Sequence, residues 1–151
     1  MSELLSSRLY DNTSFYKAFK KDLKHAQFNV IIESPFITTR RIEELMPLLR
    51  KLRQRGVRVT VNTRDPKEHD VEYEHQARLA IHEMQELGVA VLYTVRHHRK
   101  LAIIDGEILY EGSLNILSQI DSCEIMRRTV SEQLAWQMIE STGLARFAGQ
   151  A

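Results

Sequence analysis

Residues 98–105 read His-Arg-Lys-Leu-Ala-Ile-Ile-Asp, and six residues later positions 112–115 read Gly-Ser-Leu-Asn. Within the first stretch, the apolar run at 101–104 predicts a short buried strand. The Asp-Gly pair at 105–106 is typical of a tight hairpin turn, so a second, antiparallel strand is predicted at 107–110. The fold is therefore expected to contain a hairpin with polar residues at its open end.

Four polar side chains stand at that open end: His98, Lys100, Ser113 and Asn115. Because side chains alternate along a strand, His98 and Lys100 are expected on one face of the first strand. Ser113 and Asn115 follow the second strand closely. The four groups are therefore predicted to converge at one end of the sheet.

The flanking sequence alternates helical and extended patterns, with apolar residues at helical spacing and short β-branched runs between them. The predicted elements are helices at 13–27, 39–55, 68–87 and 131–146 and strands at 28–33, 57–62, 89–94 and 123–126. This order predicts an α/β sandwich in which helices cover both faces of a mixed sheet. Residues 1–151 are expected to form a single domain.

The composition is that of an ordinary globular protein, with 43% apolar and 27% charged residues and a formal net charge of +1. Net charge alone would therefore not hold the protein on nucleic acid, although local basic clusters could. The one cysteine, Cys123, excludes an intrachain disulfide and is expected to be buried. No apolar run approaches the roughly 20 residues that span a bilayer, so a soluble, cytoplasmic protein without a membrane segment is expected.

The polar residue types suit phosphoryl transfer. An imidazole such as His98 can attack phosphorus, and a second imidazole can protonate the leaving oxygen. The Lys100 ammonium and the Asn115 amide can hold the non-bridging oxygens, where negative charge builds up in the transition state, and Ser113 adds a neutral donor. Fixed positive charge thus takes the place of a metal, and neither a metal nor a cofactor is expected.

The pattern H-x-K-x-x-x-x-D, six residues, then G-S-x-N resembles the signature of the phospholipase D superfamily and matches it at every defined position. The resemblance implies a covalent phosphohistidine at His98, a phosphate held by Lys100 and Asn115, and a phosphate site lined in part by Ser113. It places Asp105 among the catalytic residues, as one that supports the site without contacting the phosphorus itself.

Members of this superfamily often carry a downstream glutamate that orients the histidine. Glu124 is the candidate here, with Asp121 as the alternative. Larger members contain two copies of the motif, whereas this chain contains one. The resemblance to small dimeric bacterial nucleases therefore implies a homodimer that brings two His98 residues to a shared active site.

Other histidines and arginines were weighed against this motif. His97 adjoins His98 but should face away from it, as a structural or rim residue. His75 and His82 are seven residues apart, so a solvated helix face is favoured over a metal site. Arginines near the predicted carboxyl ends of the strands or beside the motif are the substrate-binding candidates: Arg40, Arg41, Arg64 and Arg99.

The function that the resemblance implies is a metal-independent nuclease, with DNA favoured over RNA. Similar modules occur attached to helicases and restriction enzymes, so such a partner is a further expectation. The alternatives are a non-catalytic nucleic-acid-binding or dimerisation module, and a phospholipase or RNA-cleaving enzyme of the same superfamily. Only a measurement of turnover distinguishes the nuclease from the non-catalytic binding module. A lipid enzyme should show an exposed apolar rim, for which Phe36, Ile37 and Leu114 are the candidates.

Overall fold

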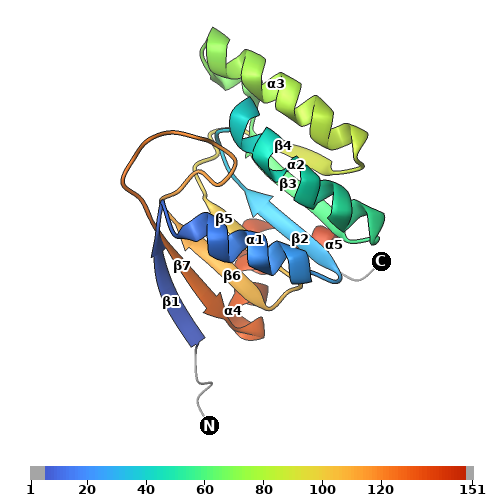
Figure 1. Cartoon of the computed structure of the whole chain (residues 1–151), viewed down its shortest axis with the longest axis vertical. Helices are drawn as coiled ribbons and strands as arrows, with labels where there is room; N and C mark the ends of the chain where they lie inside the picture. Colours follow the sequence, from blue (N-terminus) through green and yellow to red (C-terminus); the bar gives the residue numbers. More distant parts are fainter. Residues whose placement is uncertain (1–5, 149–151) are drawn as a thin grey trace.

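The computed structural model describes residues 6–148, in which seven strands form one mixed sheet in the order β1-β7-β6-β5-β2-β3-β4 (Figure 1). β2, β3 and β4 are parallel, and the remaining neighbours pair antiparallel. The strands are β1 (Ser6–Asp11), β2 (Asn29–Glu33), β3 (Arg58–Arg64), β4 (Ala90–Thr94), β5 (Leu101–Ile104), β6 (Ile108–Gly112) and β7 (Ile125–Val130). The predicted mixed sheet is confirmed.

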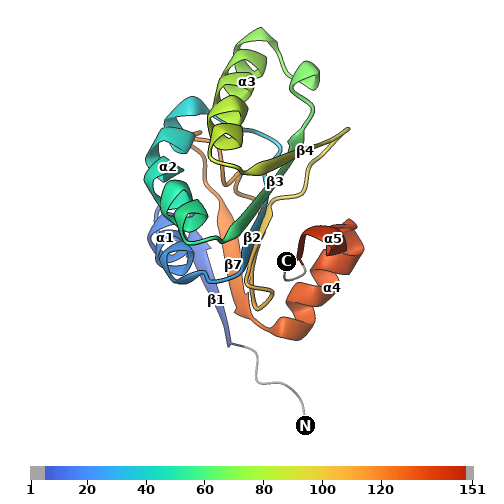
Figure 2. The same cartoon turned by 90° about the vertical axis from the view of Figure 1, so that its right-hand side faces the viewer.

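Helices cover both faces of the sheet, as predicted (Figure 2). One face carries α1 (Phe15–His25), α2 (Thr39–Gln54) and α3 (Val71–Glu86), and the other carries α4 (Glu132–Thr142) and the short α5 (Ala145–Ala148). A 3-10 turn, η1 (Pro66–Glu68), links β3 to α3. None of the helices that the structure describes is long and apolar enough to cross a membrane.

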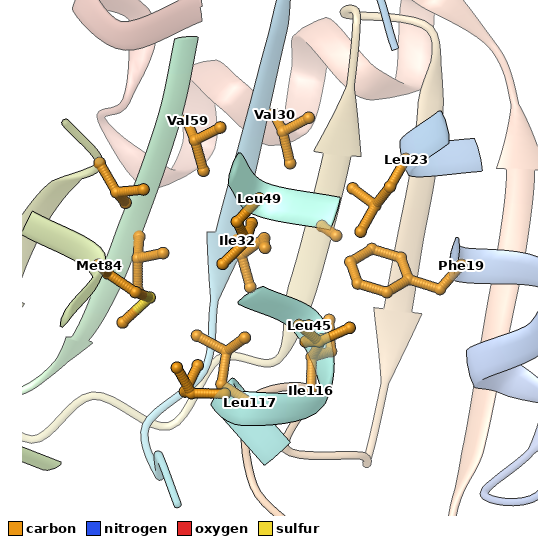
Figure 3. Close-up of a cluster of buried hydrophobic side chains, with 14 of the residues drawn as sticks. Phe19, Leu23, Val30, Ile32, Leu45, Leu49, Val59, Met84, Ile116 and Leu117 are labelled. Carbon is orange, nitrogen blue, oxygen red and sulfur yellow. The ribbon is translucent and has the colours of Figure 1, made fainter. Parts of the chain in front are cut away.

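The alternation of side chains in β2 divides the core between the two faces. Val30 and Ile32 point into the larger cluster, where they meet Leu49 of α2 (Figure 3). Ile31 points to the opposite face and joins the cluster that contains Ile139 of α4. Burial of each such side chain contributes about 1.5–3 kcal/mol, so a one-residue slip of β2 would expose several of them at once. The register of β2 is therefore strongly specified.

Some boundaries differ from the sequence prediction. β1 was not predicted, because its Ser-Ser-Arg-Leu-Tyr-Asp sequence has no apolar alternation and its residues are mostly exposed; it is held by pairing with β7. β7 itself begins two residues later than the predicted 123–126 strand and runs longer. The predicted closing helix is divided at Gly143, whose left-handed φ of 74° ends α4.

Candidate active site

The connection between β4 and β5 carries His98. β4 is an edge strand and β5 lies beyond β3 and β2, so residues 95–100 cross the carboxyl ends of those two strands. The prediction that His98 and Lys100 lie on one strand is wrong, because β5 begins only at Leu101. The Lys100 carbonyl oxygen still takes part in the pairing of β5 with β6, because it accepts a 3.3 Å hydrogen bond from the Gly112 N–H.

The exposed His98 ring faces Arg64, the last residue of β3. The Arg64 Nη2 atom lies 3.0 Å from His98 Nδ1 and 3.4 Å from Nε2, and it donates a 3.1 Å hydrogen bond to the His97 carbonyl oxygen. An arginine N–H can only donate, so this contact is a hydrogen bond only in a His98 tautomer whose facing nitrogen is unprotonated. Arg64, a predicted substrate-binding residue, thus lies directly beside the candidate nucleophile.

Lys100 supplies a second cation. Its Nζ atom donates a 2.8 Å hydrogen bond to the His98 carbonyl oxygen. Burial lowers the pKa of Lys100 and the nearby Arg64 guanidinium lowers it further, whereas the Glu124 carboxylate opposes both effects. Two cations and one carboxylate therefore interact in the neighbourhood of His98.

The loop after β6 depends on a residue without a side chain. A Cβ at Gly112 would clash with the Ile125 carbonyl oxygen and lie 2.9 Å from the Met126 Cα. This close approach lets the Ser113 N–H donate a 3.0 Å hydrogen bond to the Ile125 carbonyl oxygen, while Ser113 Oγ accepts one of 3.1 Å from the Ile125 N–H. Ser113 is therefore held against the residue that follows Glu124.

Glu124 is the carboxylate that reaches this cluster. Hydrogen bonds from Ser113 and Ser122 lower the pKa of Glu124, burial partly opposes them, and the Lys100 ammonium adds a smaller lowering effect. The alternative, Asp121, is exposed and lines a groove beside α3. No hydrogen bond among the described residues joins Glu124 to the motif histidine, so its orienting role stays a prediction.

Asn115 and Ser118 bring buried, unpartnered polar atoms to the same loop. Asn115 Oδ1 and Ser118 Oγ make no hydrogen bond within residues 6–148. Leaving such an atom without any hydrogen-bond partner costs about 1–3 kcal/mol. Both residues line a small crevice together with Glu124. Asn115 can turn either end of its amide toward a ligand, which suits a phosphate-holding role.

A buried carboxylate lies behind the connection. Glu33, the last residue of β2, is fully buried, and the Arg99 guanidinium donates hydrogen bonds of 2.7 and 2.8 Å to it. Asn62 Nδ2 donates another of 2.7 Å, and His97 Nε2 is in contact at 3.3 Å without hydrogen-bond geometry. Burial alone would raise the pKa of Glu33, but Arg99, His97 and Asn62 together lower it to about 2.

Residues 97–100 therefore alternate between two environments. His97 is buried against Glu33, which confirms the prediction that it has a structural place and faces away from His98. Glu33 occupies the Nε and Nη2 edge of the Arg99 guanidinium, while the Arg99 side chain stays 44% exposed, so the prediction that Arg99 binds substrate stays a prediction. The odd-numbered residues anchor the connection, and His98 and Lys100 are left on its other side.

Asp105 lies at the far end of β5, which corrects its placement among the catalytic residues. Its Oδ1 accepts hydrogen bonds of 2.7 Å from the Phe28 N–H and 3.1 Å from the Asn29 N–H, and its Oδ2 accepts one of 2.9 Å from the Gln27 N–H. The whole of β5, at about 3.3 Å per residue, separates it from Lys100. Asp105 therefore fixes the chain where it enters β2.

The two arginines at the start of α2 differ in availability. Arg41 stacks on the Tyr16 ring at 3.7 Å, pairs with Glu44 at 2.5 Å and donates a 3.4 Å hydrogen bond to the Ser118 carbonyl oxygen. These contacts tie Arg41 to the loop after β6, and its role as a substrate-binding residue stays a prediction. Arg40 is exposed and remains available.

Among residues 6–148, no group of three or more His, Cys, Asp or Glu side chains could hold a metal ion. His75 and His82 are exposed, as expected of a solvated helix face, and His82 Nε2 lies 2.8 Å from Glu86. Cys123, which was expected to be buried, is exposed.

Two features of the site were missed from the sequence. One is the anchoring role of Glu33, whose only signal is a carboxylate that closes an otherwise apolar strand. The other is an aromatic cluster of Phe36, His69 and Tyr73, with ring centroids 4.9–6.3 Å apart. Its members are scattered along the chain, so no local periodicity indicates it.

The sequence family described as cardiolipin synthase, PLD-like domain, matches residues 19–140 of this chain. No curated protein sequence matches it significantly.

Several solved structures share the fold. Nuc from Salmonella typhimurium, described as a phospholipase D family member, has a TM-score of 0.76 at 15% identity over 97% of this chain and 98% of Nuc. Phosphatidylserine synthase from Haemophilus influenzae has a TM-score of 0.71 at 14% identity over 97% of this chain and 40% of the synthase. TrmBL2, described as an archaeal chromatin protein with a novel mode of DNA binding, has a TM-score of 0.60 at 14% identity over 93% of this chain and 52% of TrmBL2.

Proposed function

This chain belongs to the phospholipase D superfamily, and we propose that it is a nuclease that hydrolyses phosphodiester bonds, foremost in DNA, through a covalent phosphohistidine on His98. The observation that carries the proposal is an exposed imidazole that lies between the Arg64 guanidinium, 3.0 Å from His98 Nδ1, and the Lys100 ammonium, which is bonded to the His98 carbonyl oxygen. We further propose that residues 1–151 form one such domain.

The proposed reaction has two steps. A His98 ring nitrogen attacks phosphorus, the bond to the leaving oxygen breaks, and an acid gives that oxygen a proton. Water then attacks the phosphohistidine and gives a proton to the conjugate base of that acid, the P–N bond breaks, and both the imidazole and the acid are restored. Lys100, Arg64 and Asn115 hold the non-bridging oxygens in both steps, so charge that develops on them meets cations already in place.

Neither His97 nor Glu124 suits the role of proton donor in the first step. His97 is buried against Glu33 on the other side of the connection. The lowered pKa of Glu124 keeps that group ionised at neutral pH, so it is a poor acid. A second copy of the chain, related by a twofold axis near the site, would supply its own His98 as the acid. We therefore propose a homodimer.

The cations of the site also bear on metal use. Arg64 and Lys100 supply, at the phosphate position, the positive charge that a metal ion provides in other phosphodiesterases. We therefore propose metal-independent turnover. A helicase or restriction-type partner and a cytoplasmic location stay predictions.

The test uses purified wild type, His98→Ala and, as a matched control, His82→Ala, whose ring is exposed on α3. Each is incubated in excess chelator with labelled single- and double-stranded DNA, RNA and phosphatidylglycerol vesicles. Wild type and His82→Ala are expected to cleave DNA, and His98→Ala is not. Binding without cleavage by any of the proteins would replace the proposal with a binding module. Activity that returns only with added metal would contradict the mechanism.

A further inference from the structure

The aromatic cluster is joined to His98 through Arg64. The Arg64 guanidinium carbon lies 5.1 Å from the centroid of the Phe36 ring, while Arg64 Nη2 lies 3.0 Å from His98 Nδ1. The Phe36 ring packs 4.9 Å from that of His69 and 5.5 Å from that of Tyr73, the latter in an edge-to-face arrangement. Tyr73 belongs to the first turn of α3, so the cluster links the histidine to that helix.

Burial lowers the pKa of His69, and the Arg64 charge lowers it further, against smaller opposing effects of the Pro35 carbonyl and two nearby carboxylates. The His69 ring is therefore neutral at pH 7 and acts as part of an uncharged aromatic surface. All three rings are partly buried rather than fully enclosed. The cluster thus forms one wall beside the candidate active site, with a cation at the end nearest to His98.

Tyr73 also lines a polar groove between the amino-terminal ends of α2 and α3 and the loop after β6. Its other lining residues are Thr38, Arg40, Glu72, Gln76, Gln119 and Asp121. One cation faces two carboxylates there, so the groove disfavours a second phosphate. The two amides and the carboxylates offer donors and acceptors of the kind that pair with the edges of nucleobases. A lipid chain would require an apolar lining, which this groove lacks.

We propose that this groove binds a nucleobase of single-stranded nucleic acid, stacked on Tyr73, while a phosphate of the same strand lies at His98. This inference rests on the proposed nuclease function and names its substrate class. A base can stack on a protein ring only after it leaves the duplex, so a single strand, DNA or RNA, is the substrate that fits.

The test measures binding in the His98→Ala background, which prevents turnover. The probes are a single-stranded DNA with one 2-aminopurine, an RNA of the same sequence and an abasic DNA strand of the same length. Tyr73→Ala is expected to weaken binding of both base-containing strands about tenfold, to abolish quenching of the 2-aminopurine, and to leave abasic binding unchanged. Tyr73→Phe, which keeps the ring, is expected to bind like the parent.

Two controls keep the result interpretable. Tyr73→Leu fills a similar volume without a ring, so it tests stacking if the alanine variant folds poorly. Phe28→Ala removes a half-exposed ring at the opposite end of the sheet and is expected to change nothing. If Tyr73→Ala weakened binding of abasic and normal strands equally, or weakened neither, the assignment of the groove would be overturned. Cleavage of DNA by wild type would in that case still support the nuclease proposal. Failure to bind or cleave any nucleic acid would remove both. Binding of phosphatidylglycerol vesicles that depends on Tyr73 would make the groove a lipid site.

Discussion

Arg99 binds the buried carboxylate of Glu33 through hydrogen bonds of 2.7 and 2.8 Å, directly beside the exposed His98. The contact joins the end of β2 to the connection that enters β5. Because successive residues of this connection point to opposite sides, fixing Arg99 inward leaves His98 and Lys100 outward. The Arg99–Glu33 ion pair thereby decides which side chains the site presents.

The first prediction concerns the strength of this anchor. Glu33→Gln leaves Arg99 without its buried charge partner and is expected to lower the free energy of unfolding by about 1–3 kcal/mol, measured by urea denaturation. Glu111→Gln, which removes the same kind of partner from the exposed Arg127, should cost less than about 1 kcal/mol. Equal effects of the two substitutions would show that burial of Glu33 does not matter.

The pH dependence of stability should report the same carboxylate. The pKa of Glu33 is about 2 in the folded protein, against an ordinary value of 4.5, so its stabilising contribution is complete above the ordinary value and is lost as pH falls toward 2. The difference in unfolding free energy between wild type and Glu33→Gln is therefore expected to shrink between about pH 5 and pH 2. A constant difference across this range would contradict the assignment.

Asp105 and Lys100 should separate stability from activity. Asp105→Ala removes an acceptor for three backbone N–H groups. By analogy with helix caps, it is expected to lower the free energy of unfolding by about 1–2 kcal/mol and to leave kcat of the folded fraction unchanged.

Lys100→Ala is expected to lower kcat about 100-fold or more with little change in the urea midpoint. A large kcat loss in Asp105→Ala at full folding would return Asp105 to the catalytic group.

Gly112 and Gly106 form another matched pair. Gly112→Ala introduces a Cβ that clashes with the Ile125 carbonyl oxygen, so it should displace Ser113 and lower both stability, by about 1–3 kcal/mol, and activity. Gly106→Ala meets no neighbouring atom and is penalised only by its φ of 65°, so it should lower stability without reducing kcat. Thermal melts and single-turnover cleavage measure the two effects, and unchanged activity in Gly112→Ala would contradict the packing argument.

The strands that the sequence predicts and the strand that it misses are stabilised by different interactions. β2, β3 and β5 are apolar runs whose burial decides their structure, so local pattern suffices for them. β1 is polar and exposed, and only its pairing with β7 makes it a strand. Lys100, Ser113 and Glu124 are far apart in sequence and lie close together because β5 pairs with β6 and β6 pairs with β7. The Asp105 correction follows from strand length, since β5 carries Asp105 away from Lys100.

The arginines are residues whose partners the local sequence pattern does not predict. Position near strand ends or beside the motif marked four of them as candidates; Arg99 and Arg41 pair with Glu33 and Glu44, whereas Arg64 faces His98. These partners are chosen by the course of two loops, which no periodicity in the sequence indicates.

The central claim is that His98 carries a covalent phosphoryl intermediate, and mass spectrometry tests it most directly. Wild type is mixed with single-stranded DNA in excess chelator, quenched in base to preserve the P–N bond, digested and mapped. The account predicts a nucleotide adduct on His98 that is absent from His98→Ala and retained in His97→Ala. DNA cleavage by a wild type that never carries an adduct on His98, or an adduct on His97 instead, would contradict it.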